Sequence, residues 1–338
     1  GETVIEGEAQ VVAPTVKVRR PRVALPQVHL HEKGARFAAL IAKTAPLDPV
    51  RTGVVHPCDA LSLEGALEAA ERGIIIPVLI GPRGKIEAVA LETKRDLEGV
   101  EIVDVPHSHA AADMAVSMAR AGRIEMIMKG KLHTDELLAP IVDKATGLRT
   151  DRRITHIFVL DVPHYPKPLL ISDAAINIAP DLDAKRDIVQ NAIDLAIALG
   201  NPLPKVAVLS AVETVTPTIP SSVDAAALCK MAQRGQITGG LVDGPLAFDN
   251  AVSSAAAKTK AIVSDVAGDA DVLIVPDLDA GNMVAKQLIY LAGADAAGLV
   301  LGARIPIVLT SRADGVMSRL ASAAMAQLFV HHRKGTAP

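Results

Sequence analysis

The stretch "TGVVHPCDALSLEGALEAAERGIIIPVLIG", residues 52–81, contains two apolar segments on either side of a segment with helical spacing. The two ends, 52–57 and 74–81, are short and rich in Val and Ile, which is typical of buried strands. The segment 61–73 between them predicts a helix, with Ser62 as its expected N-cap. Two strands connected through a helix normally lie parallel, so this stretch predicts a βαβ unit.

The alternation of strands and helices continues along the chain. Strands are expected at 100–105 and 124–130, with a helix at 109–122 between them. Residues 153–162 and 167–176, joined by "PHYP", predict an antiparallel hairpin instead. The remaining helices and strands are expected at 183–200, 205–211, 221–235, 237–246, 253–263, 271–277, 283–293, 306–311 and 316–333. This pattern predicts a two-domain α/β protein with mixed strand directions in its second half.

The length of 338 residues is sufficient for two domains. We expect residues 21–150 together with 295–338 to form one α/β domain and residues 151–294 to form the other, because polar strand ends from both halves must share a cleft. Residues 1–20 contain one strand-like segment and a basic stretch with prolines. A lone strand has nothing to pair with, so we expect this segment to be a remnant strand and linker from a preceding domain.

Composition excludes several classes of function. A net charge of −3, a pI near 6.4 and only six Phe and Tyr residues argue against binding to nucleic acid. The longest apolar run, 73–81, is far shorter than the ~20 residues of a membrane-spanning helix. Cys58 and Cys229 lack metal or redox spacing, which is typical of a protein in the reducing cytoplasm. No metal site is expected, because His107 and His109 lack a third ligand.

Polar side chains follow four of the predicted strands, at the place where open α/β sheets bind ligands. The segment "MKGKLHTDE" carries Lys129, Lys131, His133 and Thr134 around Gly130. Two lysines, a glycine that permits close approach and the free N–H groups of a helix start are suited to an anion. The alternative is an exposed loop in which Thr134 caps the following helix.

Two further strand ends carry carboxylates, "VDGPLAFDNA" (242–251) and "PDLDAGN". In the second of these, Asp277 and Asp279 would lie on one side of an extended segment, where they could orient a substrate. Asn282 is the expected cap of the next helix. A simple capped turn would explain the same residues.

The fourth strand end, "TSRADG", contains Ser311, Arg312 and Asp314. One interpretation is a helix cap with a solvated arginine. The other is a catalytic group, in which a hydroxyl and a guanidinium stabilise developing negative charge and Asp314 acts as a base. Four polar strand ends in one α/β protein favour the second interpretation.

The motifs "MKGKLHTDELLAP", "VDGPLAFDNAVS", "PDLDAGNMVAKQLIYLAGADAAGLVLG" and "PIVLTSRADG" resemble the phosphate acetyltransferase and phosphate butyryltransferase family. The resemblance extends from about residue 35 to residue 333. It implies reversible transfer of a short acyl group between coenzyme A and phosphate, by direct attack of the thiol on an acyl phosphate. It also implies a cleft between two α/β domains, a fold like that of isocitrate and isopropylmalate dehydrogenases, and a homodimer.

The resemblance also implies roles for single residues. Ser311 would hydrogen-bond the reacting centre, and Arg312 would stabilise the transition state. His133 and Thr134, with Lys129 and Lys131, would lie near the phosphate. The CoA site would comprise Lys286, Asn282 and Asp277. CoA is then a substrate, and no tightly bound cofactor is expected. The strand-like start resembles the junction with an N-terminal MaoC-like hydratase domain in fused members of the family.

The sequence departs from acetyl-specific members at one position of consequence. Those proteins have a catalytic Asp seven residues after the serine, where this chain has Ser318. The base and the preferred acyl chain therefore stay open. Two other functions remain as alternatives, a catalytically weakened module that binds acyl-CoA and an NAD- and metal-dependent decarboxylating dehydrogenase on the same fold.

Overall fold

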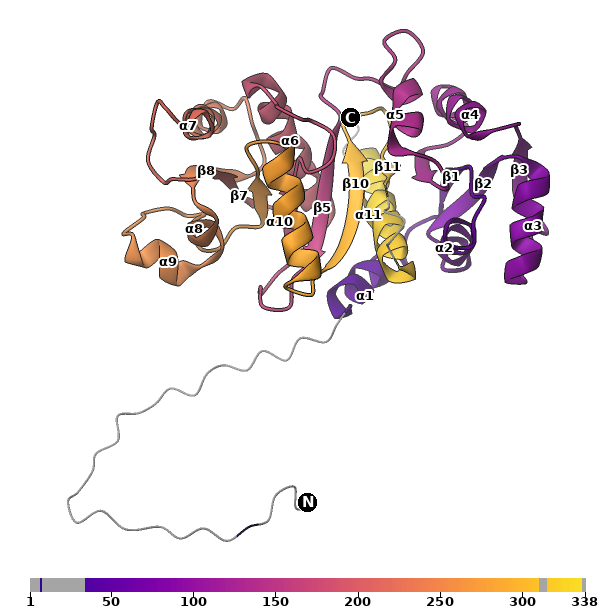
Figure 1. The fold of residues 1–338 in the computed structure, drawn as a ribbon, viewed down its shortest axis with the longest axis horizontal. Coiled ribbons are helices and arrows are strands. Elements are labelled where there is room, and N and C mark those ends of the chain that lie inside the picture. Colours follow the sequence, from indigo (N-terminus) through magenta and orange to yellow (C-terminus); the bar gives the residue numbers. More distant parts are fainter. Residues whose placement is uncertain (1–6, 8–33, 310–314, 336–338) are drawn as a thin grey trace. The chain divides into compact units, whose positions relative to one another are not determined.

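A computed structural model describes residue 7, residues 34–309 and residues 315–335 (Figure 1). The chain divides into two units, residues 1–30 and residues 31–338. The fold described below is that of the second unit. The expected strand in residues 1–20 lies outside the described residues. In the part of the chain that the structure describes, no helix is both long and apolar enough to cross a membrane.

The second unit is built on one sheet of eleven strands, in the order β3-β2-β1-β4-β11-β10-β5-β6-β9-β7-β8. The strands are β1 (Val50–Val55), β2 (Ile75–Gly81), β3 (Glu101–Asp104), β4 (Met126–Lys129), β5 (Thr155–Asp161), β6 (Leu169–Ser172), β7 (Lys205–Leu209), β8 (Leu241–Leu246), β9 (Val272–Ile274), β10 (Asp295–Leu301) and β11 (Ile307–Val308). β1 and β2 pair in parallel, which confirms the predicted βαβ unit. β5 and β6 form the predicted antiparallel pair.

Strand direction changes in the middle of the sheet. β1 to β4 and β11 are mutually parallel, whereas β11 with β10, β10 with β5 and β5 with β6 are antiparallel. β6, β9, β7 and β8 are again parallel to one another. The three antiparallel steps mean that β4 and β9 end in opposite directions. Strands β1 to β4, β10 and β11 occupy one half of the sheet and β5 to β9 the other, and the halves meet where β10 pairs with β5.

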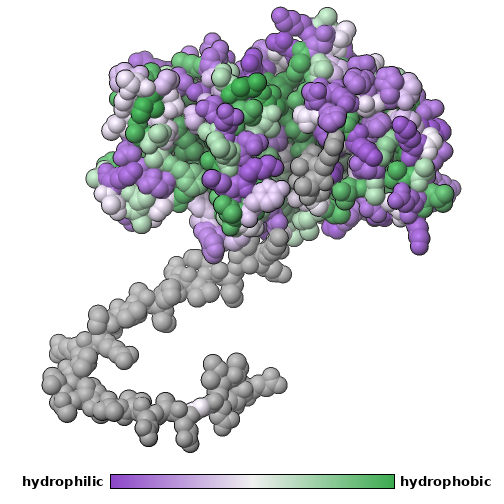
Figure 2. Space-filling view, viewed as in Figure 1, coloured by the Kyte–Doolittle hydropathy of each residue, from purple (hydrophilic) through white to green (hydrophobic). Residues whose placement is uncertain are grey.

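Helices cover both faces of the sheet. They are α1 (Ala35–Ala42), α2 (Ala60–Glu71), α3 (Arg83–Thr93), α4 (Ser108–Arg120), α5 (Thr134–Val142), α6 (Leu182–Ala198), α7 (Pro220–Gln233), α8 (Phe248–Val252), α9 (Ser254–Thr259), α10 (Leu278–Tyr290) and α11 (Val316–Gly335). Val54 and Val55 of β1 point to opposite faces, as neighbours on a strand must. Val54 packs in the apolar cluster shared by α2 and α11, and Val55 packs in the cluster of α4 and α5. Figure 2 shows hydrophobic side chains near the middle of the visible face, with many hydrophilic ones around them.

Some element boundaries differ from the prediction. β10 was not expected, because Ala and Gly dominate its first half and both have low strand propensity. α1, α3 and α8 were also missed. α10 begins at Leu278, five residues before the predicted 283, because Asp and Gly in "DLDAGN" indicated a turn where the chain is already helical.

His156 lies in the middle of the sheet, on β5, and is 1% exposed. A Cβ at Gly298 on β10 would lie 2.8 Å from its Nε2, so the glycine makes room for the ring. Its Nδ1 has no hydrogen-bond partner among the described residues. Burial lowers the pKa of His156 from 6.5 to about 4, because the charged ring would lose its hydration.

The lowered pKa of His156 predicts acid sensitivity. The unfolded chain binds the proton of this histidine near pH 6.5, and the folded chain binds it only near pH 4. The contribution of the neutral ring to the free energy of unfolding is therefore fully present above pH 6.5 and is lost as the pH falls toward 4. Between pH 7 and pH 5 we expect wild type to lose about 2 kcal/mol more free energy of unfolding than His156→Gln. Urea unfolding at both pH values measures this difference. His164→Gln, at an exposed histidine, is the control, and an equal loss in wild type and His156→Gln would contradict the prediction.

Candidate functional site

The loop after β1 turns sharply before α2. His56 has a positive φ of 54°, and its carbonyl accepts hydrogen bonds from the N–H groups of Cys58 (2.8 Å) and Lys131 (2.8 Å). The N-cap of α2 is Asp59, whose Oδ1 accepts from Ser62 N (2.8 Å) and Ser62 Oγ (2.6 Å). The predicted cap, Ser62, was therefore wrong by three residues. Ser62 instead lies in the first turn and is held by the true cap.

The end of β4 is fixed against the same loop. Gly130 N donates to Val55 O at 2.9 Å, which continues the pairing of β4 with β1. A Cβ at Gly130 would lie 2.4 Å from Val55 O and 2.6 Å from His56 O. Only glycine fits at this distance. The glycine thus permits the close approach of β1 backbone, rather than of a ligand as the sequence suggested, and it holds Lys129 and Lys131 in place on either side.

His133 and Thr134 stand at the start of α5. His133 occupies the N-cap position with no side-chain hydrogen bond to the helix, and Thr134 is the first helical residue. The alternative in which Thr134 caps the helix is therefore wrong. Asp135 and Glu136 lie in the first turn, where they favour the helix dipole.

A cavity of about 250 Å³ lies where β1 and β4 end. Its lining comprises Asp59, Ala60, Leu61, Ser62, Lys129, Gly130, Lys131 and Arg319. β1 and β4 are parallel neighbours in the sheet, and the helices that follow them, α2 and α5, lie on opposite faces of it. Open α/β sheets bind their ligands at such a switch point.

The charges of this cavity are suited to an anion. Three of its lining residues are cations, of which Lys129 and Arg319 are only 6% and 7% exposed. Among the described lining residues, the one carboxylate is that of Asp59, which is engaged in capping α2. The first turn of α2 adds the partial positive charge of a helix N-terminus. A phosphate group would find both cations and N–H donors here.

Cys58 lies beside the cavity and is 8% exposed. Burial raises the pKa of its thiol, an effect that the nearby charges of Lys85 and Lys131 oppose. The thiol therefore stays protonated near neutral pH, and we assign it no role in the chemistry.

Ser311, Arg312 and Asp314, the predicted catalytic residues, lie outside the described residues. The described residues on either side of this segment lie next to residues that line the cavity. Val308 of β11 pairs with Met128, the residue before Lys129. After the gap, Arg319 N donates to Gly315 O at 3.2 Å in the first turn of α11. Ser318, where acetyl-specific members have Asp, lies on the same helix.

The predicted CoA residues lie on and before α10. Asp277 is its N-cap and accepts from Ala280 N at 2.9 Å, so the capped turn proved right and the predicted cap, Asn282, wrong. Asp279 lies in the first helical turn and not beside Asp277 on an extended segment. Asn282 Nδ2 donates to Ala174 O at 3.3 Å, and Lys286 Nζ lies 5.8 Å from the centre of the Tyr290 ring.

The structure thus brings some of the predicted residues together. Lys129 and Lys131 share a cavity, and His133 and Thr134 follow Lys131 by two and three residues. Asp277, Asn282 and Lys286 follow β9, which ends in the opposite direction to β4. Strand direction alone therefore does not place them at one edge. Among the described residues, no three His, Cys, Asp or Glu side chains gather as metal ligands would.

The sequence did not identify Asp59, Ser62 or Arg319 as residues of this site. Asp59 and Ser62 were not identified because both residue types are common at the start of a helix, where they need no further explanation. Arg319 stands inside a long helical pattern, where an arginine normally indicates a solvated face. Its one signal was the spacing to the "TSRADG" motif, which puts it in the first turn of the following helix.

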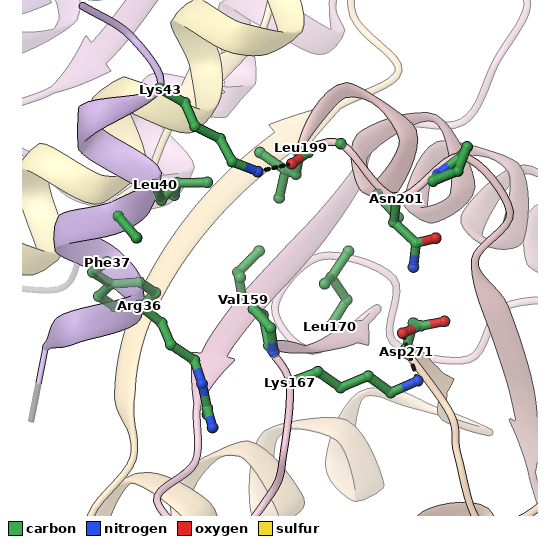
Figure 3. Close-up of a pocket in the computed structure, with 15 residues that line it drawn as sticks. Arg36, Phe37, Leu40, Lys43, Val159, Lys167, Leu170, Leu199, Asn201 and Asp271 are labelled. Carbon is green, nitrogen blue, oxygen red and sulfur yellow. Dashed lines mark hydrogen bonds and ion pairs between the residues drawn. The ribbon is translucent and has the colours of Figure 1, made fainter. Parts of the chain in front are cut away.

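A larger cavity, of about 480 Å³, lies between α1 and the C-terminal end of α6 (Figure 3). Val159 and Leu170 contribute apolar surface to it. Its charged groups already have partners, since Lys43 Nζ donates to Leu199 O at 2.8 Å and Lys167 pairs with Asp271 at 2.7 Å. Most of its other lining residues are apolar, which suits an anionic substrate poorly.

Residues 107–327 match the family model described as phosphate acetyl/butaryl transferase. The chain is 62% identical over 300 residues to a phosphate acetyltransferase from Rhizobium meliloti, covering 89% of this chain and 95% of that protein. It is 38% identical over 292 residues to a phosphate butyryltransferase from Clostridium acetobutylicum, covering 86% and 97%.

A solved structure is also similar. The crystal structure of a branched-chain phosphotransacylase from Enterococcus faecalis matches with a TM-score of 0.72 and 29% identity, over 83% of this chain and 99% of that one. The shared fold agrees with the mixed α/β sheet described above. The chain therefore belongs to the phosphate acetyl/butaryl transferase family and is a phosphate acyltransferase.

Proposed function

We propose that the cavity at the ends of β1 and β4 binds the phosphate group in the reaction of this enzyme, the reversible transfer of an acyl group between coenzyme A and phosphate. One observation carries the proposal. Two nearly buried cations, Lys129 and Arg319, line a cavity together with the first turn of α2. Cations and helix N–H groups together favour a phosphate over a neutral ligand. His133 and Thr134, at the start of α5, extend the same site.

The chemical step is direct attack of the CoA thiolate on the carbonyl carbon of the acyl phosphate. A C–S bond forms, the C–O bond to phosphate breaks, and phosphate leaves. A thiol with a pKa of about 8.5 needs only modest help to ionise, and phosphate leaves readily. The protein therefore acts mainly by positioning and by charge. In this proposal Ser311 binds the reacting centre, Arg312 stabilises the developing charge, and Asp314 takes the thiol proton.

CoA is elongated, so its remote groups can contact a second part of the protein. We assign that part to α10, through Lys286, Asn282 and the Asp277 cap. Lys286 supplies the positive charge that CoA phosphates require. CoA acts as a substrate, and the proposal includes no tightly bound cofactor.

The two-domain division also belongs to the proposal. The described strands of residues 21–150 and 295–338 are contiguous in the sheet, and those of residues 151–294 are contiguous beside them. Among these described strands, β10 with β5 is the one pairing across the boundary. This arrangement supports two α/β domains around a cleft, as in isocitrate and isopropylmalate dehydrogenases. We further propose a cytoplasmic homodimer.

Acetyl phosphate is the proposed acyl donor, because the relative named for acetyl transfer is far more similar than the one named for butyryl transfer. Assays of CoA thiol consumption with acetyl, propionyl and butyryl phosphate test this choice. We expect kcat/KM to be at least about tenfold lower for butyryl than for acetyl phosphate, since each added methylene must fit the acyl pocket. A preference for butyryl phosphate would contradict the choice of acyl group, and no thioester from any of the three would contradict the function.

A further inference from the structure

Helices α2 and α11 approach each other closely where Gly65 meets Arg319. A Cβ at Gly65 would lie 2.9 Å from Arg319 Cδ and 3.5 Å from Arg319 Cβ. Gly65 is in the interior of α2, where glycine is less favourable than alanine. The glycine is therefore explained by its neighbour, because any side chain at this position would displace the stem of Arg319.

This packing fixes the direction of the Arg319 side chain. The residue is 7% exposed and belongs to the lining of the cavity that also contains Lys129 and Lys131. An arginine stem held between two helices has already lost most of its rotamer freedom. Binding an anion then costs little further conformational entropy, which increases the affinity.

We propose that Arg319 is a further phosphate-binding residue and that Gly65 is the positioning residue that holds it in the cavity, an inference that rests on the proposed function of this site. The planar guanidinium donates two parallel hydrogen bonds to phosphoryl oxygens, which lysine does not reproduce. Each of the four elements that form the site then contributes a group to phosphate binding. β4 supplies Lys129, the loop after it supplies Lys131, α11 supplies Arg319, and α2 supplies both N–H donors and the gap for the arginine.

Four single variants separate this role from simple packing. Arg319→Met keeps the apolar stem over Gly65 and removes the charge, while Arg319→Lys keeps the charge without the planar fork. Gly65→Ala displaces the stem but leaves the charge present. Gly84→Ala is the matched control, because Gly84 also lies in a helix, α3, and a Cβ there meets nothing within 4 Å.

The readout is the KM for phosphate and the KM for CoA, each measured with acetyl substrates. We expect Arg319→Met to raise the KM for phosphate about 10- to 50-fold and to leave the KM for CoA within about twofold, since the charged hydrogen bonds of the guanidinium to phosphate are lost. Arg319→Lys should restore part of the loss, and Gly65→Ala should raise the same constant about 3- to 10-fold by misplacing the guanidinium. Gly84→Ala should change neither constant. An unchanged KM for phosphate in Arg319→Met would overturn the proposal.

Thermal unfolding tests the positioning role separately. In wild type, Gly65→Ala should lower the Tm, because the added methyl group meets the arginine stem. In the Arg319→Ala background the stem is absent, so Gly65→Ala should raise the Tm, because alanine has the higher helix propensity. A Tm shift of the same sign and size in both backgrounds would show that Gly65 and Arg319 act independently.

Failure of the proposed function would be distinguishable from failure of this inference. If wild type forms no thioester, the function is wrong, and inorganic phosphate alone still probes the site. Phosphate that raises the Tm of wild type and not that of Arg319→Met would uphold Arg319 as an anion-binding residue. Equal protection of both, or of neither, would overturn it.

Discussion

Arg312→Ala is expected to lower the turnover number about 10²–10³-fold, because a fixed donor aimed at developing negative charge contributes roughly that much to catalysis. The residue belongs to the "TSRADG" motif, whose preceding strand β11 pairs with β4 beside Lys129. Steady-state rates of acetyl-CoA formation at saturating substrates measure the effect.

Arg312→Lys is the informative companion to the alanine variant. A lysine keeps the charge but lacks the planar fork that matches phosphoryl and carboxyl oxygens, so we expect it to recover less than about a tenth of the turnover. Near-normal turnover in Arg312→Ala would show that the transferase mechanism described above is wrong, whatever substrate the enzyme prefers.

Lys129→Met is expected to lower kcat/KM for phosphate about 100-fold. Lys129 is 6% exposed and lines the cavity, so water screens its charge from the anion only weakly. The free energy of a hydrogen bond to a charged group is then at the upper end of its usual range. Initial rates of CoA release from acetyl-CoA, measured over a range of phosphate concentrations, give this ratio.

The matched control for Lys129 is Lys144→Met, at an exposed lysine that does not line the cavity. It should leave the phosphate dependence as in wild type, which would exclude a general effect of net charge. If Lys129→Met and Lys144→Met had equal phosphate dependence, the anion site would have to lie elsewhere.

Much of the fold was predictable from local pattern. The short Val- and Ile-rich strands around 61–73 and the hairpin around "PHYP" were predicted because each pattern has one favoured structure. Strand order and direction were harder to predict. The pairings of β11 with β10, β10 with β5 and β5 with β6 are antiparallel, and hydrophobic periodicity does not distinguish antiparallel from parallel pairing. β10 was missed because "DAAGLVL" begins with residues of low strand propensity.

In the candidate site, too, features set by neighbouring residues in the sequence could be predicted, and contacts between distant residues could not. Lys129 and Lys131 were predicted because they lie at the end of a buried strand and just after it. Helix caps were placed within a few residues, as with Asp59 and Ser62, because either residue type is a good N-cap and only the geometry decides between them. Arg319 could not be predicted, since its burial depends on the approach of a helix that lies about 250 residues earlier in the sequence, at Gly65.

The position of phosphate bound to the protein tests the assignment of this site most directly. Crystals of wild type grown with inorganic phosphate and CoA should show a phosphate within hydrogen-bond distance of Lys129, Lys131 and Arg319, at the first turn of α2. The same experiment with Arg319→Met should show it with lower occupancy. A phosphate bound instead beside Lys286 on α10, with the cavity at the ends of β1 and β4 empty, would contradict the account.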